Sequence, residues 1–193
     1  LAARLSVNII NVIVEHSGRY GLTIEFAAWT GLRAGEQIAL TWEDIDFERG
    51  LVLVRRARKK DGSVGAAKTK AGHRSIPIDV DLLAKLRAWK LAQPIEQRVN
   101  NLVFPTSTGA MDSWRNRGLH IACDRAGVER ITWHSLRHFF ASILLFDLQE
   151  ADATVTTLMG HKDISFTRRQ YGHWMDDARR DTDIAERLRR ARG

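Results

Sequence analysis

Apolar residues recur at intervals of three and four near the start of the chain, which is the spacing of one face of a helix. This pattern predicts helices over residues 5–16 and 22–29 and a short helix over residues 34–40. Gly31 lies between the second and the third, where glycine supplies the left-handed conformation that ends many helices. The chain therefore begins as a helical domain.

The same periodicity returns after residue 79 and continues almost to the end of the chain. Gly127 and Gly160 each follow an apolar helical pattern directly and are expected to end it. The helices expected here are one capped by Asp79 or Asp81 and reaching residue 92, then residues 114–126, 135–148, 152–159, 164–171 and 176–190. The segment at 135–148 is strongly apolar, so we expect it at the centre of the core.

Strand-forming patterns lie between these two helical regions. Gly50 marks a turn before the β-rich residues 51–54, and residues 73–78 have the composition of a returning strand. Between them, residues 59–70 are polar and contain glycines, which is typical of a mobile hairpin loop. We therefore expect an α+β fold that is mainly helical, with one small antiparallel sheet of about three strands.

The composition, with 44% hydrophobic and 27% charged positions, is that of a soluble globular protein, and the length of 193 residues fits one domain or two small ones. No apolar run approaches the roughly 20 residues that a membrane helix needs, so no membrane partner is expected. The single cysteine, Cys123, excludes a disulfide within the chain and fits a reducing cytoplasm. The chain starts at Leu1 without a methionine or a secretory signal, so we expect it to be a fragment of a longer protein.

The formal net charge of +7 favours an anionic partner, although a basic surface without a specific partner is also compatible with it. Three stretches carry side chains that suit an anion, and the first is Thr30–Glu36. Arg33 stands just past the glycine stop, and Glu36 follows three residues later, close enough to hold its guanidinium. Alone, such a pair is more often a surface arginine beside a helix-capping glutamate.

The second stretch is Thr132–His138, at the start of the strongly apolar helix. His134 and Arg137 are three residues apart and therefore lie on one face. His138 follows four residues after His134, and two histidines at this spacing could also form part of a zinc site. However, Ser135 stands where a metalloprotease helix needs a glutamate, so no metal is expected. Alone, this stretch is better explained by core or surface histidines.

The third stretch holds His161 at a helix end and Tyr171 ten residues later, and alone it would indicate packing. Together, and in this order, the three stretches resemble the catalytic domain of the tyrosine recombinases, the phage integrase family. The resemblance covers about residues 20 to 175, with Met159 in place of the family's usual leucine. It implies the catalytic residues Arg33, Lys68, His134, Arg137, His161 and Tyr171, supported by Glu36, with Lys70 as the alternative to Lys68.

The resemblance implies that DNA strands are cut and rejoined through a 3′-phosphotyrosine intermediate. Arg33 and Arg137 would bind the non-bridging phosphate oxygens, and His161 would add a third hydrogen bond. His134 suits a proton acceptor for the tyrosine hydroxyl, and Lys68 suits a proton donor to the leaving 5′-oxygen. The phosphotyrosine preserves the bond energy, so neither ATP, a metal nor another cofactor is expected.

Double-stranded DNA is the partner that the resemblance implies. Basic residues of the hairpin region would lie against the duplex and give salt-sensitive contacts, namely Arg55, Arg56, Arg58, Lys59, Lys60 and Lys70. For each of them, a solvated surface charge is the alternative. Two other functions stay open, a type IB topoisomerase and a non-catalytic DNA-binding regulator. The intact set of catalytic residues favours a site-specific recombinase over both.

The resemblance also implies an assembly on DNA. Family members dock a C-terminal segment on a neighbouring protomer, so residues 176–190 are expected to link copies into a tetramer. Family members also carry an N-terminal domain that clamps the DNA. We expect residues 1–193 to be one catalytic domain without that clamp, and therefore to bind DNA weakly. The expected location is the bacterial cytoplasm, at the nucleoid.

Overall fold

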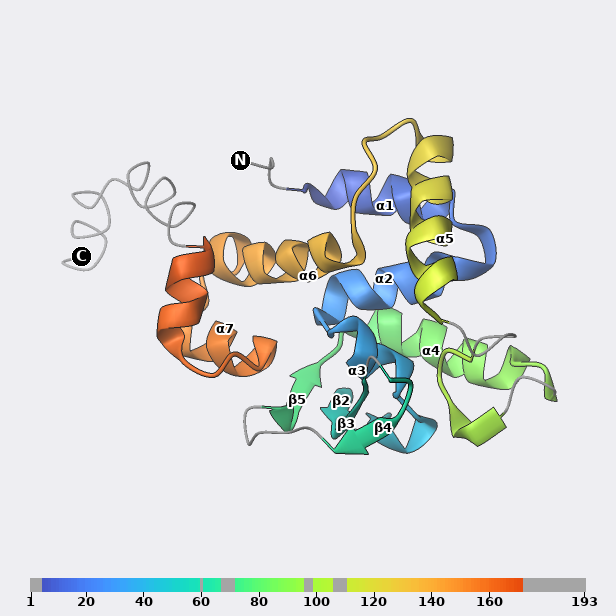
Figure 1. Ribbon diagram of the computed structural model, residues 1–193, viewed down its shortest axis with the longest axis horizontal. Helices are drawn as coiled ribbons and strands as arrows, with labels where there is room; N and C mark the ends of the chain where they lie inside the picture. The colour runs from blue at the N-terminus through green and yellow to red at the C-terminus, as the bar shows by residue number, and fades with distance from the viewer. Residues whose placement is uncertain (1–4, 60, 67–71, 96–98, 106–110, 172–193) are drawn as a thin grey trace.

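The computed structural model describes residues 5–59, 61–66, 72–95, 99–105 and 111–171, and Figure 1 shows a mainly helical body with a small sheet on one side. Its helices are α1 Val7–Glu15, α2 Gly21–Thr30, α3 Ala34–Ile38, α4 Val80–Ala92, α5 Met111–Ala126, α6 Trp133–Ser142 and α7 Asp152–Met159. Residues 164–171 form a further helical segment. These helices are confirmed, whereas the one expected at 176–190 lies outside the described residues.

The helix expected at residues 135–148 differs from the expectation at its start and in its second half. α6 begins at Trp133 because Thr132 Oγ1 accepts from the Ser135 N–H over 3.2 Å and caps the first turn. From Ile143 to Asp147 the backbone continues as a π-helix. π-helical turns are rare in proteins, and a large share of those that exist lie at functional sites.

The antiparallel sheet is confirmed. β2 Leu51–Val54 lies between β1 Ile45–Asp46 and β5 Arg74–Pro77. Val52 and Val54 are buried while their neighbours in the strand are less so, which is the alternation of a sheet with one face on the core. The small sheet thereby covers one side of the helical body.

A separate two-stranded ladder joins β3 Arg56–Arg58 to β4 Val64–Ala66. The residues expected as a loop from 59 onward therefore include a paired strand. Its turn is closed by Asp61, whose Oδ1 accepts from the Ser63 N–H over 2.9 Å. The sequence pattern does not reveal this pairing, because β4 is short and lacks a clear apolar alternation.

Two hydrophobic clusters hold these elements together. One gathers the sheet, α4 and the end of the described chain, and includes Val52, Ile76, Leu86 and Tyr171. The other gathers α1, α2, α5 and α6, and includes Ile10, Ile24, Leu119, Leu136 and Phe139. α2 and α6 pack against each other and contribute to both clusters. The strongly apolar segment at residues 135–148, which contains most of α6, is therefore central to the core as expected. In the described part of the chain, no helix has the length and apolar character needed to cross a membrane.

Two glycine stops bring distant segments together. Gly31 ends α2 with φ +58°, and a Cβ built on it would come within 2.5 Å of Phe140 Cδ1 on α6. Gly160 ends α7 in the same left-handed conformation, with φ 61°. Only glycine fits both demands at Gly31, because other residues rarely adopt this φ and any side chain would collide. The fold thereby places residues 31–36 beside residues 158–161.

Candidate active site

Arg33 is fixed at the start of α3 by the glutamate that follows it. The Arg33 backbone N–H donates to Glu36 Oε2 over 2.8 Å, and Arg33 Nη1 donates to Glu36 Oε1 over 2.9 Å. Arg33 Nη2 donates to the carbonyl oxygen of Gly160, 2.8 Å away in the turn after α7. Its side chain nevertheless remains 45% exposed. Arg33 is therefore held on one side and accessible to an anion from solvent on the other.

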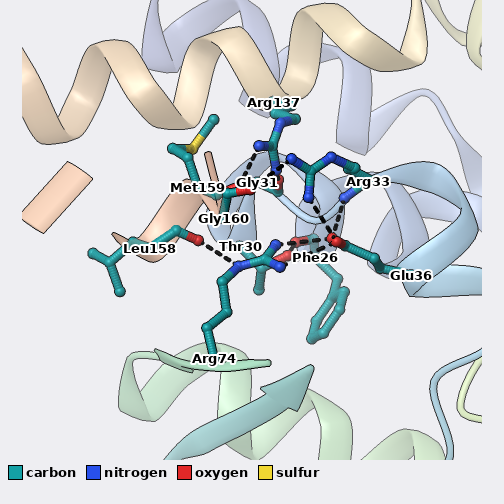
Figure 2. Close-up of polar contacts among 10 residues, drawn as sticks. All are labelled: Phe26, Thr30, Gly31, Arg33, Glu36, Arg74, Arg137, Leu158, Met159 and Gly160. Carbon is teal, nitrogen blue, oxygen red and sulfur yellow. Dashed lines mark hydrogen bonds and ion pairs between the residues drawn. The ribbon is translucent and has the colours of Figure 1, made fainter. Parts of the chain in front are cut away.

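Arg137, on α6, is buried beside the same turn. Its Nη1 donates to the carbonyl oxygen of Gly31 over 2.6 Å, and its Nη2 donates to the carbonyl oxygen of Met159. Burial, followed by the charge of Arg33, lowers the pKa of Arg137 to about 9, so the guanidinium stays protonated at neutral pH. The two predicted arginines thus lie together and join the end of α2 to the end of α7 (Figure 2).

His161 directly follows Gly160 and is buried. Thr167 Oγ1 lies 2.8 Å from His161 Nδ1, and Thr156 Oγ1 lies 2.9 Å from Thr167 Oγ1. These contacts orient the ring through Nδ1 and leave Nε2 as the nitrogen suited to a ligand. Burial and then the nearby arginines lower the pKa of His161 to about 4, so the ring is neutral at pH 7.

Tyr171 lies at the end of the described helical segment and is only 2% exposed. Its hydroxyl is 3.0 Å from His138 Nδ1, and its ring stacks with that of His161 at a centroid distance of 6.5 Å and an angle of 18°. Burial raises the pKa of Tyr171 to about 12, even though the charge of Arg137 acts to lower it. The predicted nucleophile is therefore a protonated phenol that feels the charge of Arg137.

The contact of His138 with the tyrosine hydroxyl was not predicted, because the sequence pattern suggested a zinc ligand or a core or surface histidine at this position. His134 is exposed at the start of α6, and its ring lies edge-on to that of His138, 4.4 Å away. Desolvation, and then the charges of Arg137 and Arg33, lower the pKa of His134. The role of His134 as proton acceptor stays a prediction. The position of His138 four residues after His134, and therefore on the same helix face, was a signal that this side chain also faces the site.

A second residue that sequence reasoning missed is Arg74, in β5. Its guanidinium is buried and pairs with Glu36, at 2.8 Å between Arg74 Nη2 and Glu36 Oε2. Burial raises the pKa of Glu36, but the hydrogen bond and charge of Arg74, and then Arg33, outweigh it and hold that pKa below its usual value. Glu36 is therefore an anion between two arginines.

The basic residues expected on DNA lie partly within the described chain. Arg55 Nη1 and Arg56 Nη2 lie 3.7 and 3.1 Å from Oδ1 of the buried Asp44. Arg58 ends β3, and Lys59 is exposed after it. Those outside the described residues are Lys60, Lys68 and Lys70. The DNA contacts, and the choice between Lys68 and Lys70, therefore stay predictions.

We expect the neutral histidines of this site to make the fold sensitive to acid. His138 and His161 have pKa values of about 4 in the folded chain, with burial as the largest cause for each, against about 6.5 when unfolded. The unfolded chain therefore binds more protons below pH 6.5, and stability falls as the pH drops toward 4. We expect a loss of about 1–2 kcal/mol for each histidine between pH 7 and pH 5.

Urea unfolding of wild type, His138→Asn and His161→Asn at pH 7 and pH 5 measures this effect. Each variant should lose less stability than wild type between the two pH values, because asparagine does not titrate. Equal losses in all three proteins would show that these histidines are not held neutral by the fold.

Known proteins resemble this chain in sequence. The model of the phage integrase family matches residues 6–177. The prophage integrase IntR of Escherichia coli K12 is 29% identical in an alignment of 197 residues that covers 90% of this chain and 48% of that protein. The tyrosine recombinase XerC-like protein of Caldanaerobacter subterraneus is 32% identical in an alignment of 168 residues that covers 75% of this chain and 43% of that protein. The chain thus spans about half the length of these curated relatives.

Solved structures share its fold. The Tn1549 transposon integrase in complex with transposon right end DNA superposes with a TM-score of 0.76 at 22% identity, covering 98% of this chain and 66% of that one. The XerA recombinase gives a TM-score of 0.73 at 22% identity, with 94% and 64% covered. The expected fold is confirmed by these likenesses. From the match over residues 6–177, the chain belongs to the phage integrase family, the tyrosine recombinases.

Proposed function

We propose that this chain is the catalytic domain of a site-specific DNA recombinase in which the Tyr171 hydroxyl attacks a backbone phosphate. The observation that carries the proposal is the convergence of two kinds of group. The Tyr171 hydroxyl lies 3.0 Å from a histidine nitrogen and within the electrostatic influence of Arg137. Arg137 in turn shares one turn of the chain with Arg33 and His161. This arrangement supports the proposal, because the proposed nucleophile lies close to the arginines proposed to bind the phosphate.

The two arginines supply binding and transition-state stabilisation. A guanidinium has five N–H donors, and the contacts described above engage two on Arg33 and two on Arg137. The remaining donors suit the non-bridging oxygens of a phosphodiester, whose negative charge grows as the tyrosine oxygen attacks. The neutral His161 adds a hydrogen-bond donor from Nε2. Because the surrounding carbonyls already hold the guanidinium groups, little reorganisation is needed when the phosphate binds.

In the chemical step the Tyr171 oxygen forms a bond to phosphorus and the bond from phosphorus to the 5′-oxygen breaks. The tyrosine proton passes to a histidine, and His134 is the proposed acceptor; the 5′-oxygen takes a proton from the proposed donor, Lys68. The products are a 3′-phosphotyrosine and a free 5′-hydroxyl. Reversal with the 5′-hydroxyl of another strand rejoins the DNA. In both directions of the reaction, the backbone carbonyls of Gly31, Met159 and Gly160 hold the two arginines in place, and the histidines supply hydrogen bonding and proton transfer.

Relatives support DNA as the partner of this site. The Tn1549 integrase and the XerH recombinase, which share the fold, were solved with transposon DNA and with the difH substrate. We propose that this chain likewise binds double-stranded DNA, and that it acts at the bacterial nucleoid. We also propose that residues 176–190 link protomers into a tetramer, and that the chain is one catalytic domain. The linking residues lie outside the described part of the structure.

A nicked suicide substrate tests the function. When a strand is cut close to a nick, the short 5′-hydroxyl fragment diffuses away and the covalent complex accumulates. We expect an adduct that resists denaturation, forms in EDTA and retains label placed 5′ to the cut. Transfer between two DNA molecules would then separate a recombinase from a topoisomerase, which would relax supercoils without a second site. Absence of any adduct at saturating protein would contradict the proposal and leave a DNA-binding regulator.

Lys68 and Lys70 can be separated by changing the leaving group. Lys68→Met should slow cleavage by about 10²–10⁴-fold, because the 5′-oxygen then leaves without its proton. A substrate with sulfur in place of that 5′-oxygen should restore most of the rate, since a thiolate is a far better leaving group. Single-turnover cleavage of both substrates measures this. Lys70→Met is the matched control and should cut both at nearly the wild-type rate; the opposite pattern would move the role to Lys70.

A further inference from the structure

Arg74 is a buried arginine that makes three hydrogen bonds between strand and helices. Its side chain is 2% exposed. Nη1 donates to Glu36 Oε1 over 3.0 Å and Nη2 donates to Glu36 Oε2 over 2.8 Å, which is a bidentate pair. Nε donates to the carbonyl oxygen of Leu158 over 2.7 Å. One guanidinium therefore joins β5 to α3 and to the last turn of α7.

The partners of Arg74 are the groups that hold the two predicted phosphate ligands. Glu36 uses the same two oxygens to accept from the side chain and backbone of Arg33. Leu158 directly precedes Met159 and Gly160, whose carbonyl oxygens accept from Arg137 and Arg33. Figure 2 shows Arg74 approaching this group from the side of the sheet, opposite to Arg137. Each contact of Arg74 is thus one step from Arg33 or Arg137.

The charge of Arg74 also matters for the exposed arginine. Glu36 is buried, and its anion is kept by Arg74 together with Arg33. With Arg74 present, the group formed by Arg74, Glu36 and Arg33 carries a net positive charge. Arg33 can therefore still attract a phosphate, because its own charge is not cancelled by Glu36. Without it, Glu36 and Arg33 would neutralise each other, and the guanidinium of Arg33 would be drawn toward the carboxylate. Loss of Arg74 would therefore weaken Arg33 as a phosphate ligand.

We propose that Arg74 is a positioning residue of the phosphate site and does not touch DNA itself. It orients Arg33 through Glu36, and it holds the turn at residues 158–161 in place through the Leu158 carbonyl. This inference rests on the proposed function. It also gives β5 a role, because this strand begins six residues after Lys68 in the sequence. β5 is thus anchored on the same glutamate that anchors Arg33.

A double-mutant cycle in the suicide-substrate assay separates this role from a merely structural one. Arg74→Met should slow single-turnover cleavage at saturating DNA by about 10²-fold, while Arg33→Met slows it by about 10³-fold. If Arg74 acts through Arg33, the double variant should be within about 10-fold of Arg33→Met alone. A structural role would give independent losses, whose product is about 10⁵-fold.

Arg74→Lys covers the case in which Arg74→Met does not fold. Lysine keeps the charge but cannot make the bidentate pair, so we expect a folded protein that cuts about 10-fold more slowly than wild type. The matched control is Arg130→Met, which removes an exposed arginine that also pairs with both oxygens of a carboxylate, that of Asp124. It should cut at the wild-type rate.

The outcomes distinguish the two levels of the proposal. If wild type forms the adduct and the losses of Arg74→Met and Arg33→Met multiply, or if Arg74→Met cuts like wild type, the positioning role is wrong while the proposed function stands. If wild type forms no adduct, the proposed function fails and the role of Arg74 fails with it. A non-additive cycle with partial rescue by lysine supports both.

Discussion

Replacement of Tyr171 by phenylalanine is expected to abolish the covalent complex with DNA, with a loss of at least about 10⁴-fold in cleavage. Phenylalanine keeps the ring but removes the only oxygen that the proposed mechanism uses as nucleophile. The measurement is single-turnover cleavage of a nicked suicide substrate, followed on a denaturing gel. Among single substitutions in the site, this one should have the largest effect, because it removes a reacting atom.

The fold of the Tyr171→Phe variant should survive. The ring is buried in the cluster that contains Val52 and Ile76, and the substitution preserves those contacts. The lost hydrogen bond to His138 is expected to cost about 1 kcal/mol. Thermal unfolding and DNA binding should therefore stay close to those of wild type. A variant that is folded, binds DNA and still cuts would show that Tyr171 is not the nucleophile.

Replacement of Arg137 by lysine has the second largest expected effect. A lysine carries its donors on a single nitrogen, so it cannot reproduce the two nitrogens with which the guanidinium reaches the carbonyls of Gly31 and Met159. We expect cleavage to fall by about 10²–10³-fold. We also expect the free energy of unfolding to fall by about 1–3 kcal/mol, because a buried carbonyl loses its donor. Suicide-substrate kinetics and urea unfolding measure the two losses.

Arg125→Lys is the control for Arg137→Lys, because Arg125 is exposed in the last turn of α5. It should leave cleavage unchanged and shift stability by no more than about 0.5 kcal/mol. An Arg137→Lys protein that cuts DNA as fast as this control would remove Arg137 from the proposed phosphate site.

Local features of the sequence predicted much of the fold. Gly31 and Gly160 are left-handed helix stops in the structure, and Asp79 caps α4 as one of the two expected candidates. These features depend on residues a few positions apart, so a single sequence carries them. The same holds for the contact between Arg33 and Glu36, which lie in one turn.

Contacts between distant segments could not be predicted in this way. Arg74 and Glu36 are 38 positions apart, and His138 and Tyr171 are 33 apart. The order of motifs brought Arg33, Arg137 and Tyr171 into one hypothesis through resemblance, without the carbonyls that hold them. Those carbonyls have no sequence signal, because every residue carries one. The strand pattern around Arg74 likewise indicates a strand and nothing of the glutamate that its side chain binds.

In the proposed mechanism the Tyr171 oxygen becomes covalently bonded to a DNA phosphorus. Mass spectrometry of the trapped complex, after digestion by protease and nuclease, tests it most directly. We predict one modified peptide that contains Tyr171, with its mass raised by a 3′-phosphorylated nucleotide and with fragment ions that place the addition on the tyrosine. An addition on any other residue, or a linkage to the 5′-end of the cut strand, would contradict this mechanism.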